Sequence, residues 1–224
     1  MSDTPSGNAP APSARQGDLF EDLAPGVDAG FATARRIELD ATSWIEHVPG
    51  WLHGSAGLFD ELMATAAWEQ RDRYMYGRRL AEPRLTAEYA DIAVAPQRLL
   101  HVITETLSEQ YGVAYRYLWL NLYRTHRDST SWHGDPIAKV QETSTVPVLS
   151  LGAARRFLIR PAEGGQSVSL TAASGDLIVM GGRAQRDWRH SVPKQATPAG
   201  PRISINFAPH LTLARGQNPA AYPA

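Results

Sequence analysis

A histidine and a carboxylate separated by one residue occur in the middle of the chain, as His133 and Asp135. In an extended backbone, residues two apart leave the same face, about 6–7 Å apart along the chain, so both can reach one metal ion. His190, in a Trp-Arg-His-Ser-Val-Pro stretch, is the best candidate for a third ligand. Two histidines and one carboxylate leave three octahedral positions open, which is typical of non-haem Fe(II) oxygenases.

Each of these residues alone is equally compatible with an ordinary loop or core position. The residues around them favour a site. Asn121 and Tyr123 alternate on a predicted strand and therefore share one of its faces. Arg202 begins the last apolar strand, twelve residues after His190. A guanidinium there can pair with the distal carboxylate of a 2-oxo acid.

The elements that must position these residues are predicted to form an α+β fold, with a helical amino-terminal third and an all-β core. Apolar spacing predicts helices over residues 58–70, capped by Ser55, and 96–111, ending at Gly112. Asp40 or Thr42 is expected to cap a short helix that ends near His47. Strands are predicted over residues 36–40, 115–123, 146–151, 156–160, 166–170, 176–180 and 202–207. Short strands at such intervals indicate a β-sandwich or barrel.

Composition excludes several classes of protein. The 224 residues, 43% apolar and 20% charged, are enough for one domain with a sizeable core and rule out full disorder or a fibrous repeat. The absence of Cys excludes disulfides, thiolate metal sites and cysteine nucleophiles. No segment has the order of a signal peptide, and no apolar run approaches the roughly 20 residues of a membrane span. A cytoplasmic protein without membrane contact fits best.

Seven segments together resemble the AlkB-like Fe(II)- and 2-oxoglutarate-dependent dioxygenases over residues 70–207. They are residues 82–89, 121–124, 127–135, 149–157, 175–180, 188–193 and 201–207. The resemblance implies a double-stranded β-helix, or jelly roll, with amino-terminal helices and a nucleotide-recognition lid. The composition of residues 1–17, rich in Pro, Ala, Ser and Gly without periodicity, predicts a disordered tail, and one domain is expected at 18–215 with a second tail at 216–224. Within the domain, the lid is expected at about residues 70–96 and the core at about 114–210.

The resemblance also assigns roles to individual positions. Those matched to Fe(II) ligands are His133, Asp135 and His190. Those matched to 2-oxoglutarate contacts are Asn121, Tyr123, Arg202 and Ser204. Arg202 would pair with the C5 carboxylate of this co-substrate, and dioxygen would take the last metal position. The implied reaction is demethylation of N-alkylated bases in DNA or RNA, with release of formaldehyde, succinate and carbon dioxide.

Two departures from the family pattern keep other functions open. The family usually has a second arginine six residues after the first, where this chain has Ala208. Many relatives also have acidic residues after the His-x-Asp motif, where this chain has Pro136, Ile137 and Ala138. One alternative is therefore a 2-oxoglutarate oxygenase that acts on a protein side chain or a small metabolite. Another is a non-catalytic jelly-roll module with a relict metal site, although the intact triad argues against it.

The segment 71–96 is rich in arginine and tyrosine and is the predicted lid. A base inside a duplex must leave the stack to reach a buried metal. The residues predicted to contact such a nucleic acid are Tyr74, Tyr76, Arg84 and Tyr89. Tyrosines can stack on a base and arginines can meet phosphates. The alternative is a solvated surface loop that its tyrosines anchor to the core.

Two features outside this site have two interpretations each. The segment Gln16–Phe20 resembles the short motif by which bacterial replication proteins bind the sliding clamp, and a disordered peptide of this kind can fold on binding. The same segment is also explained as a plain lead-in to the first element. Arg155 and Arg156 are either a phosphate contact or an exposed surface pair.

Overall fold

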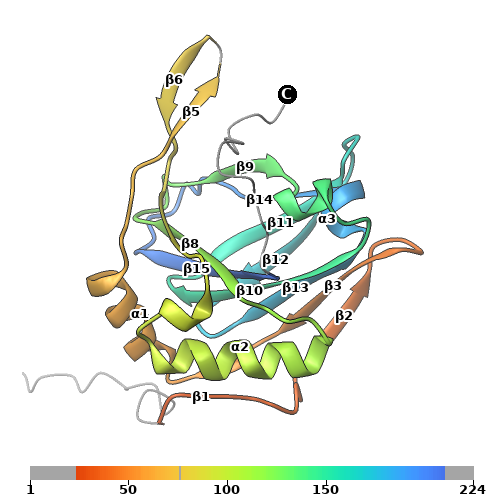
Figure 1. Cartoon of the computed structure of the whole chain (residues 1–224). Helices are drawn as coiled ribbons and strands as arrows, with labels where there is room; N and C mark the ends of the chain where they lie inside the picture. The colour runs from red at the N-terminus through yellow and green to blue at the C-terminus, as the bar shows by residue number, and fades with distance from the viewer. Residues whose placement is uncertain (1–23, 76, 210–224) are drawn as a thin grey trace, which may run out of the picture.

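Two antiparallel β-sheets face each other, and helices cover the outer face of the larger one (Figure 1). The computed structural model describes residues 24–75 and 77–209. The larger sheet has the strand order β2 (Arg35–Glu38), β3 (Ser43–Val48), β13 (Leu177–Gly182), β10 (Ser144–Gly152), β15 (Arg202–Ala208), β8 (Tyr117–Tyr123) and β7 (Leu85–Tyr89). The smaller sheet has the order β12 (Val168–Ala172), β11 (Arg155–Pro161), β14 (Trp188–Val192) and β9 (Thr130–His133).

The remaining elements are two small two-stranded sheets and five helical segments. The paired strands are β1 (Gly26–Val27) with β4 (Leu52–His53), and β5 (Asp72–Met75) with β6 (Arg78–Ala81). The helical segments are α1 (Ser55–Thr65), η1 (Ile92–Val94), α2 (Arg98–Tyr111), η2 (Pro136–Lys139) and α3 (Ala184–Asp187). The β5–β6 pair projects away from the two sheets (Figure 1).

Side-chain alternation in the larger sheet divides the interior into two cores. On β15, Ile203, Ile205 and Phe207 join the core beneath the helices. The residues between them, Arg202, Ser204 and Asn206, line the space between the two sheets. This division follows from the two-residue period of a strand. The predicted α+β jelly roll is therefore confirmed, and its best-predicted strands are those with apolar residues on both faces.

The two main helices agree with the sequence prediction in place and differ in their ends. Helix α2 buries Leu100, Ile103 and Leu107 and ends at Gly112, whose positive φ of 64° gives the predicted left-handed cap. Helix α1 begins three residues before the predicted start and ends five before the predicted end. Gly54, not Ser55, occupies the N-cap position, and the Ser55 hydroxyl instead bonds to Ser174.

The prediction of a short helix that ends near His47 is wrong. Residues 43–48 form strand β3, paired on one side with β2 and on the other with β13. Ser43 and Ile45 are buried and alternate with the more exposed Trp44 and Glu46, which is the period of a strand. Sheet pairing on both edges outweighs the weak capping signal of Asp40.

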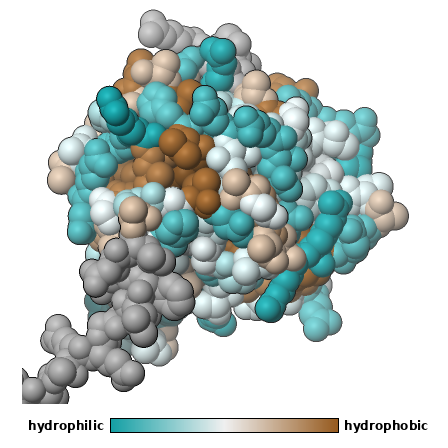
Figure 2. Space-filling model, turned by 90° about the horizontal axis from the view of Figure 1, so that it is seen from below, coloured by the Kyte–Doolittle hydropathy of each residue, from teal (hydrophilic) through white to brown (hydrophobic). Residues whose placement is uncertain are grey.

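Hydrophilic residues cover most of the molecular face seen in Figure 2, which also has a hydrophobic area. Large hydrophobic side chains that remain exposed in the helical layer are Met63, Val94 and Val102. No helix within residues 24–75 and 77–209 combines the length and hydropathy needed to cross a membrane. The predicted tails and the segment Gln16–Phe20 lie outside the described residues, so the sliding-clamp interpretation stays a prediction. The cytoplasmic interpretation also stays a prediction.

A substitution at Leu62 tests how much the packing of helix α1 against the sheet contributes to the free energy of unfolding. The Leu62 side chain is fully buried, whereas the adjacent Met63 is 36% exposed. We expect Leu62→Ala to lower the free energy of unfolding by about 2–5 kcal/mol, since it removes buried methyl groups and leaves a cavity. Met63→Ala, the matched control, should change it by less than about 0.5 kcal/mol in urea denaturation. Equal effects of the two variants would contradict this packing.

Candidate active site

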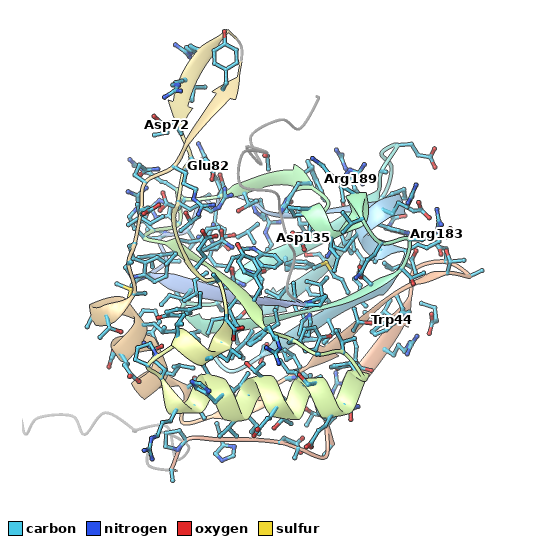
Figure 3. All side chains as sticks on the ribbon, in the orientation of Figure 1. Trp44, Asp72, Glu82, Asp135, Arg183 and Arg189 are labelled. Atoms are coloured by element: carbon cyan, nitrogen blue, oxygen red, sulfur yellow. The ribbon has the colours of Figure 1, made fainter. Side chains whose placement is uncertain are left out.

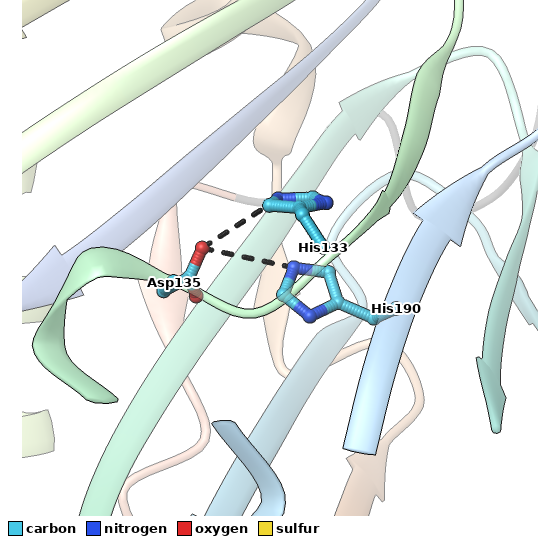
Figure 4. A group of neighbouring side chains, drawn as sticks. All are labelled: His133, Asp135 and His190. Carbon is cyan, nitrogen blue, oxygen red and sulfur yellow. Dashed lines mark ion pairs between the residues drawn. The ribbon is translucent and has the colours of Figure 1, made fainter. Parts of the chain in front are cut away.

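The register between two strands of the smaller sheet brings the predicted metal ligands together (Figure 4). His133, the last residue of β9, pairs directly with His190 of β14. Asp135 follows two residues later, and its Oδ1 lies 3.7 Å from the Nε2 atom of each histidine. The three ligand atoms all lie within 4.8 Å of one another, which is the arrangement that can hold one divalent cation.

The environment of these side chains suits a cation. The backbone oxygen of Ser131 accepts a hydrogen bond from His133 Nδ1 at 2.9 Å, so Nε2 is the unprotonated nitrogen of the neutral ring. Burial, followed by the charge of His133, holds the pKa of His190 well below its usual range and keeps this ring neutral. Burial raises the pKa of Asp135 to about 7. A bound cation offsets the cost of a buried carboxylate and needs neutral imidazoles.

Gln185, a residue that the sequence reasoning missed, holds the other side of Asp135. Its Oε1 accepts a hydrogen bond from the Asp135 backbone N–H at 2.7 Å, and its Nε2 donates to Asp135 Oδ2 at 2.8 Å. Gly134 permits this contact, because a Cβ there would lie 2.2 Å from the Gln185 carbonyl oxygen. No periodic pattern marks the four-residue helix α3, so no sequence signal pointed to it.

A cavity of about 870 Å³ opens between the sheets above these residues and contains a buried arginine. Arg202 is 1% exposed, and its Nη2 donates to Ser150 Oγ at 2.8 Å. Its Nε and Nη1 have no hydrogen-bond partner among the described residues. Burial lowers the pKa of this guanidinium. Two buried, unsatisfied donors on one planar group match a carboxylate of a ligand.

The other residues predicted to bind 2-oxoglutarate lie beside Arg202 in the same cavity. Strand pairing places Tyr123 opposite Arg202 and Asn121 opposite Ser204. Asn121 Nδ2 donates to Ser204 Oγ at 3.2 Å, and Tyr123 exchanges a hydrogen bond of 2.8 Å with Thr130. The structure thus brings all four predicted positions to one wall, where polar atoms face the space that a small acid would fill.

The predicted nucleic-acid contacts that the structure describes lie in different surroundings. Tyr74, on the β5–β6 hairpin, is 65% exposed and lines the cavity mouth. Arg84 lies deeper, where its Nε donates to Asn121 Oδ1 at 2.9 Å and its Nη2 contacts Glu82 at 2.9 Å. Tyr89 instead packs against the core beneath the helices, and burial raises its pKa. Tyr76 lies outside the described residues.

The carboxylates around the cavity lie on two levels. Figure 3 shows Asp72 at the hairpin and Glu82 beneath it, with Asp135 lower down between the sheets. The positions after the His-x-Asp motif contribute Pro136 and Ile137 to the cavity wall. The upper cavity is therefore lined by both acidic and basic side chains, whereas the wall next to the three metal ligands is partly apolar.

Arg155 is neither a phosphate contact nor an exposed residue, so both interpretations were wrong for it. It is 1% exposed and lies with its Cζ 5.6 Å from the Tyr123 ring centroid. It donates hydrogen bonds to the backbone oxygens of Thr125, Asp128 and Pro193 and to the side chain of Gln195. One guanidinium thereby ties the loop after β8 to the loop after β14. Arg156, its neighbour, is exposed.

Comparison with known proteins places this site in a family. The family model described as "2OG-Fe(II) oxygenase superfamily" matches residues 61–207. The chain belongs to this superfamily. The cofactors of the superfamily are Fe(II) and 2-oxoglutarate, with dioxygen as co-substrate. The match spans the predicted ligand positions from Asn121 to Ser204.

Similar proteins agree with the AlkB-like assignment within the superfamily. "Alpha-ketoglutarate-dependent dioxygenase alkB homolog 3" is 31% identical over 170 residues in Homo sapiens, covering 67% of this chain and 59% of that protein. The Bos taurus protein of that name is 29% identical over 181 residues, covering 71% and 63%. "DNA oxidative demethylase ALKBH2" of Arabidopsis thaliana is 26% identical over 191 residues, covering 66% and 60%.

The chain therefore spans less than two thirds of the length of these curated relatives, 59–63% of it. A solved structure, "The structure of OsALKBH1", superimposes with a TM-score of 0.57 at 13% identity and covers 79% of this chain and 100% of that one. At such identity, the likeness concerns the fold, and it agrees with the jelly roll described above.

A substitution at His190 tests the candidate metal site. We expect His190→Ala to weaken Mn(II) binding strongly, because it removes a ligand atom. The loss in affinity should exceed the roughly 10–100-fold that follows removal of a hydrogen-bond partner of a ligand. Electron paramagnetic resonance of free Mn(II) measures the affinity. His101→Ala, on helix α2, is the control and should bind Mn(II) as the wild type does. Unchanged binding in His190→Ala would exclude this residue as a ligand.

Arg202 tests the acid-binding wall. We expect Arg202→Met to weaken 2-oxoglutarate binding by about 2–5 kcal/mol, since the carboxylate loses its buried charge partner. Isothermal titration calorimetry with the Mn(II)-loaded protein gives the affinity, and Mn(II) binding itself should not change. Arg156→Met, on the same protein but exposed, is the control. Equal affinity for 2-oxoglutarate in both variants would refute the assignment.

Proposed function

We propose that this chain is an Fe(II)- and 2-oxoglutarate-dependent dioxygenase that removes N-linked methyl groups from bases in DNA or RNA. One observation carries the proposal: the buried guanidinium of Arg202, with two unsatisfied donors, shares a cavity with the three potential metal ligands. The printed names of the relatives, a dioxygenase of the AlkB type and a DNA oxidative demethylase, support this choice of substrate.

The chain's own residues provide orientation and charge for this reaction. His133, Asp135 and His190 present their ligand atoms to one point on the smaller sheet. Arg202 would hold the distal carboxylate of 2-oxoglutarate on the opposite wall, and the amide of Asn121 would orient the co-substrate beside it. When bound, Fe(II) with 2-oxoglutarate and dioxygen supplies the oxidising power that hydroxylates a methyl carbon. The hydroxymethyl product then loses formaldehyde.

The mouth of the cavity suits a base that has left its stack. Tyr74 offers an exposed aromatic ring on the projecting hairpin, and a flipped base can stack on such a ring. The guanidinium of Arg79 lines the same region and can meet a phosphate. Glu82 and Glu88 also line the cavity. Arg84 and Arg71 form ion pairs with these two carboxylates, which offsets their charge, so the choice of an N-methylated base rests on the printed names of the relatives.

The decisive experiment measures formaldehyde release from oligonucleotides that contain 1-methyladenine or 3-methylcytosine. We expect release that requires both Fe(II) and 2-oxoglutarate and that disappears in His190→Ala, since this variant lacks a ligand. Single-stranded and duplex DNA and RNA form separate arms. Succinate production without any effect of oligonucleotide would favour the protein side-chain or metabolite alternative. Lack of turnover in every arm, with normal Mn(II) binding, would favour the non-catalytic module.

A further inference from the structure

We propose that Gln185 is a positioning residue that makes Asp135 a ligand through one oxygen atom. The inference rests on the proposed function, since it concerns the metal site of that reaction. No prediction from the sequence assigned a role to Gln185. Its amide contacts Asp135 at two points and has no contact with the cavity. Its effect must therefore pass through Asp135.

The two oxygens of Asp135 have different surroundings. Oδ1 lies 3.7 Å from the Nε2 atoms of both His133 and His190, on the side where the ligand atoms converge. Oδ2 faces away from them and accepts the hydrogen bond from Gln185 Nε2 at 2.8 Å. An occupied Oδ2 lone pair and a fixed χ2 angle leave Oδ1 as the atom that is offered to a metal. One-oxygen binding uses one position and keeps three positions open.

The second contact fixes the backbone of the same residue. Oε1 of Gln185 accepts the Asp135 N–H at 2.7 Å, so one amide group closes a ring with both the main chain and the side chain. Asp135 and Gln185 are 5% and 2% exposed, and water does not compete for these bonds. The ring holds the segment between strand β9 and η2, which has no sheet partner at this point.

The connection between β13 and β14 is built to bring this amide into place. Helix α3 lies directly before β14, which carries His190, so the clamp and one ligand belong to one continuous segment. Gly134 leaves room for the carbonyl oxygen of Gln185, and the Met180 sulfur lies 3.5 Å from Nε2. Partners of metal-bound carboxylates commonly set ligand orientation in this way.

The test compares two buried glutamines in the full-length protein. Gln185→Met keeps the length and apolar volume of the side chain but removes both hydrogen bonds. Gln97→Met is the matched control, because Gln97 is 1% exposed and donates to Thr65 beneath the sheet, far from the cavity. Mn(II) affinity is measured by electron paramagnetic resonance, and the visible spectrum of the Co(II)-loaded protein reports coordination number.

We expect Gln185→Met to weaken Mn(II) binding by about 10–100-fold. We also expect an altered Co(II) spectrum, because Oδ2 becomes free to coordinate. Gln97→Met should lose stability without either change. If Gln185→Met does not fold, Gln185→Asn, which is too short to make both bonds, takes its place with the same expected result. Unchanged Mn(II) affinity and Co(II) spectrum would overturn the inference. A wild type that binds no Mn(II) would instead overturn the proposed function.

Discussion

The site depends on the register with which β9 and β14 pair. His133 and His190 are directly opposite, and both rings leave the inner face of the smaller sheet. A slip of either strand by one residue would turn its histidine to the other face and separate the two rings, because side chains alternate along a strand. The irregularity after His190, where Val192 pairs with Thr130, lies at the outer end of this ladder and leaves the ligand pair intact. Local pairing of two short strands thus determines whether a cation can bind at all.

How much of this arrangement can be predicted from the sequence depends on what each residue contacts. Strands with continuous apolar patterns, such as β10 and β13, are predictable because both of their faces are buried. Strands β9 and β14 carry polar functional side chains, and their pattern does not distinguish them from loops. The ligands themselves were nonetheless predictable from residue type and spacing. Gln185 and Arg155 were not, since their roles arise from contacts across 50 and up to 40 residues of sequence.

Two buried cations shape the wall opposite the metal site. Arg202 and Arg155 lie with their guanidinium carbons 5.2 Å and 5.6 Å from the ring centroid of Tyr123. Arg155 satisfies its donors with carbonyl and amide oxygens of two loops, whereas Arg202 leaves two donors open to the cavity. Arg155 therefore stabilises the wall, and Arg202 is the residue that can bind a ligand. Ala208, where the family usually has a further arginine, is fully buried at the end of β15 and adds no charge to the wall.

Strand β15 has all seven residues buried, yet its two faces serve different ends. Ile203, Ile205 and Phe207 are apolar and secure the helical layer, whereas Arg202, Ser204 and Asn206 border the reaction space. The property that a mutation affects should therefore alternate along this strand between folding and ligand binding. Substitutions at the apolar positions are limited by whether the chain still folds. Substitutions at the cavity-lining positions are limited by whether the protein still binds its ligand. Substitutions at the cavity-lining positions can therefore change which ligand binds while the core-facing positions keep the fold.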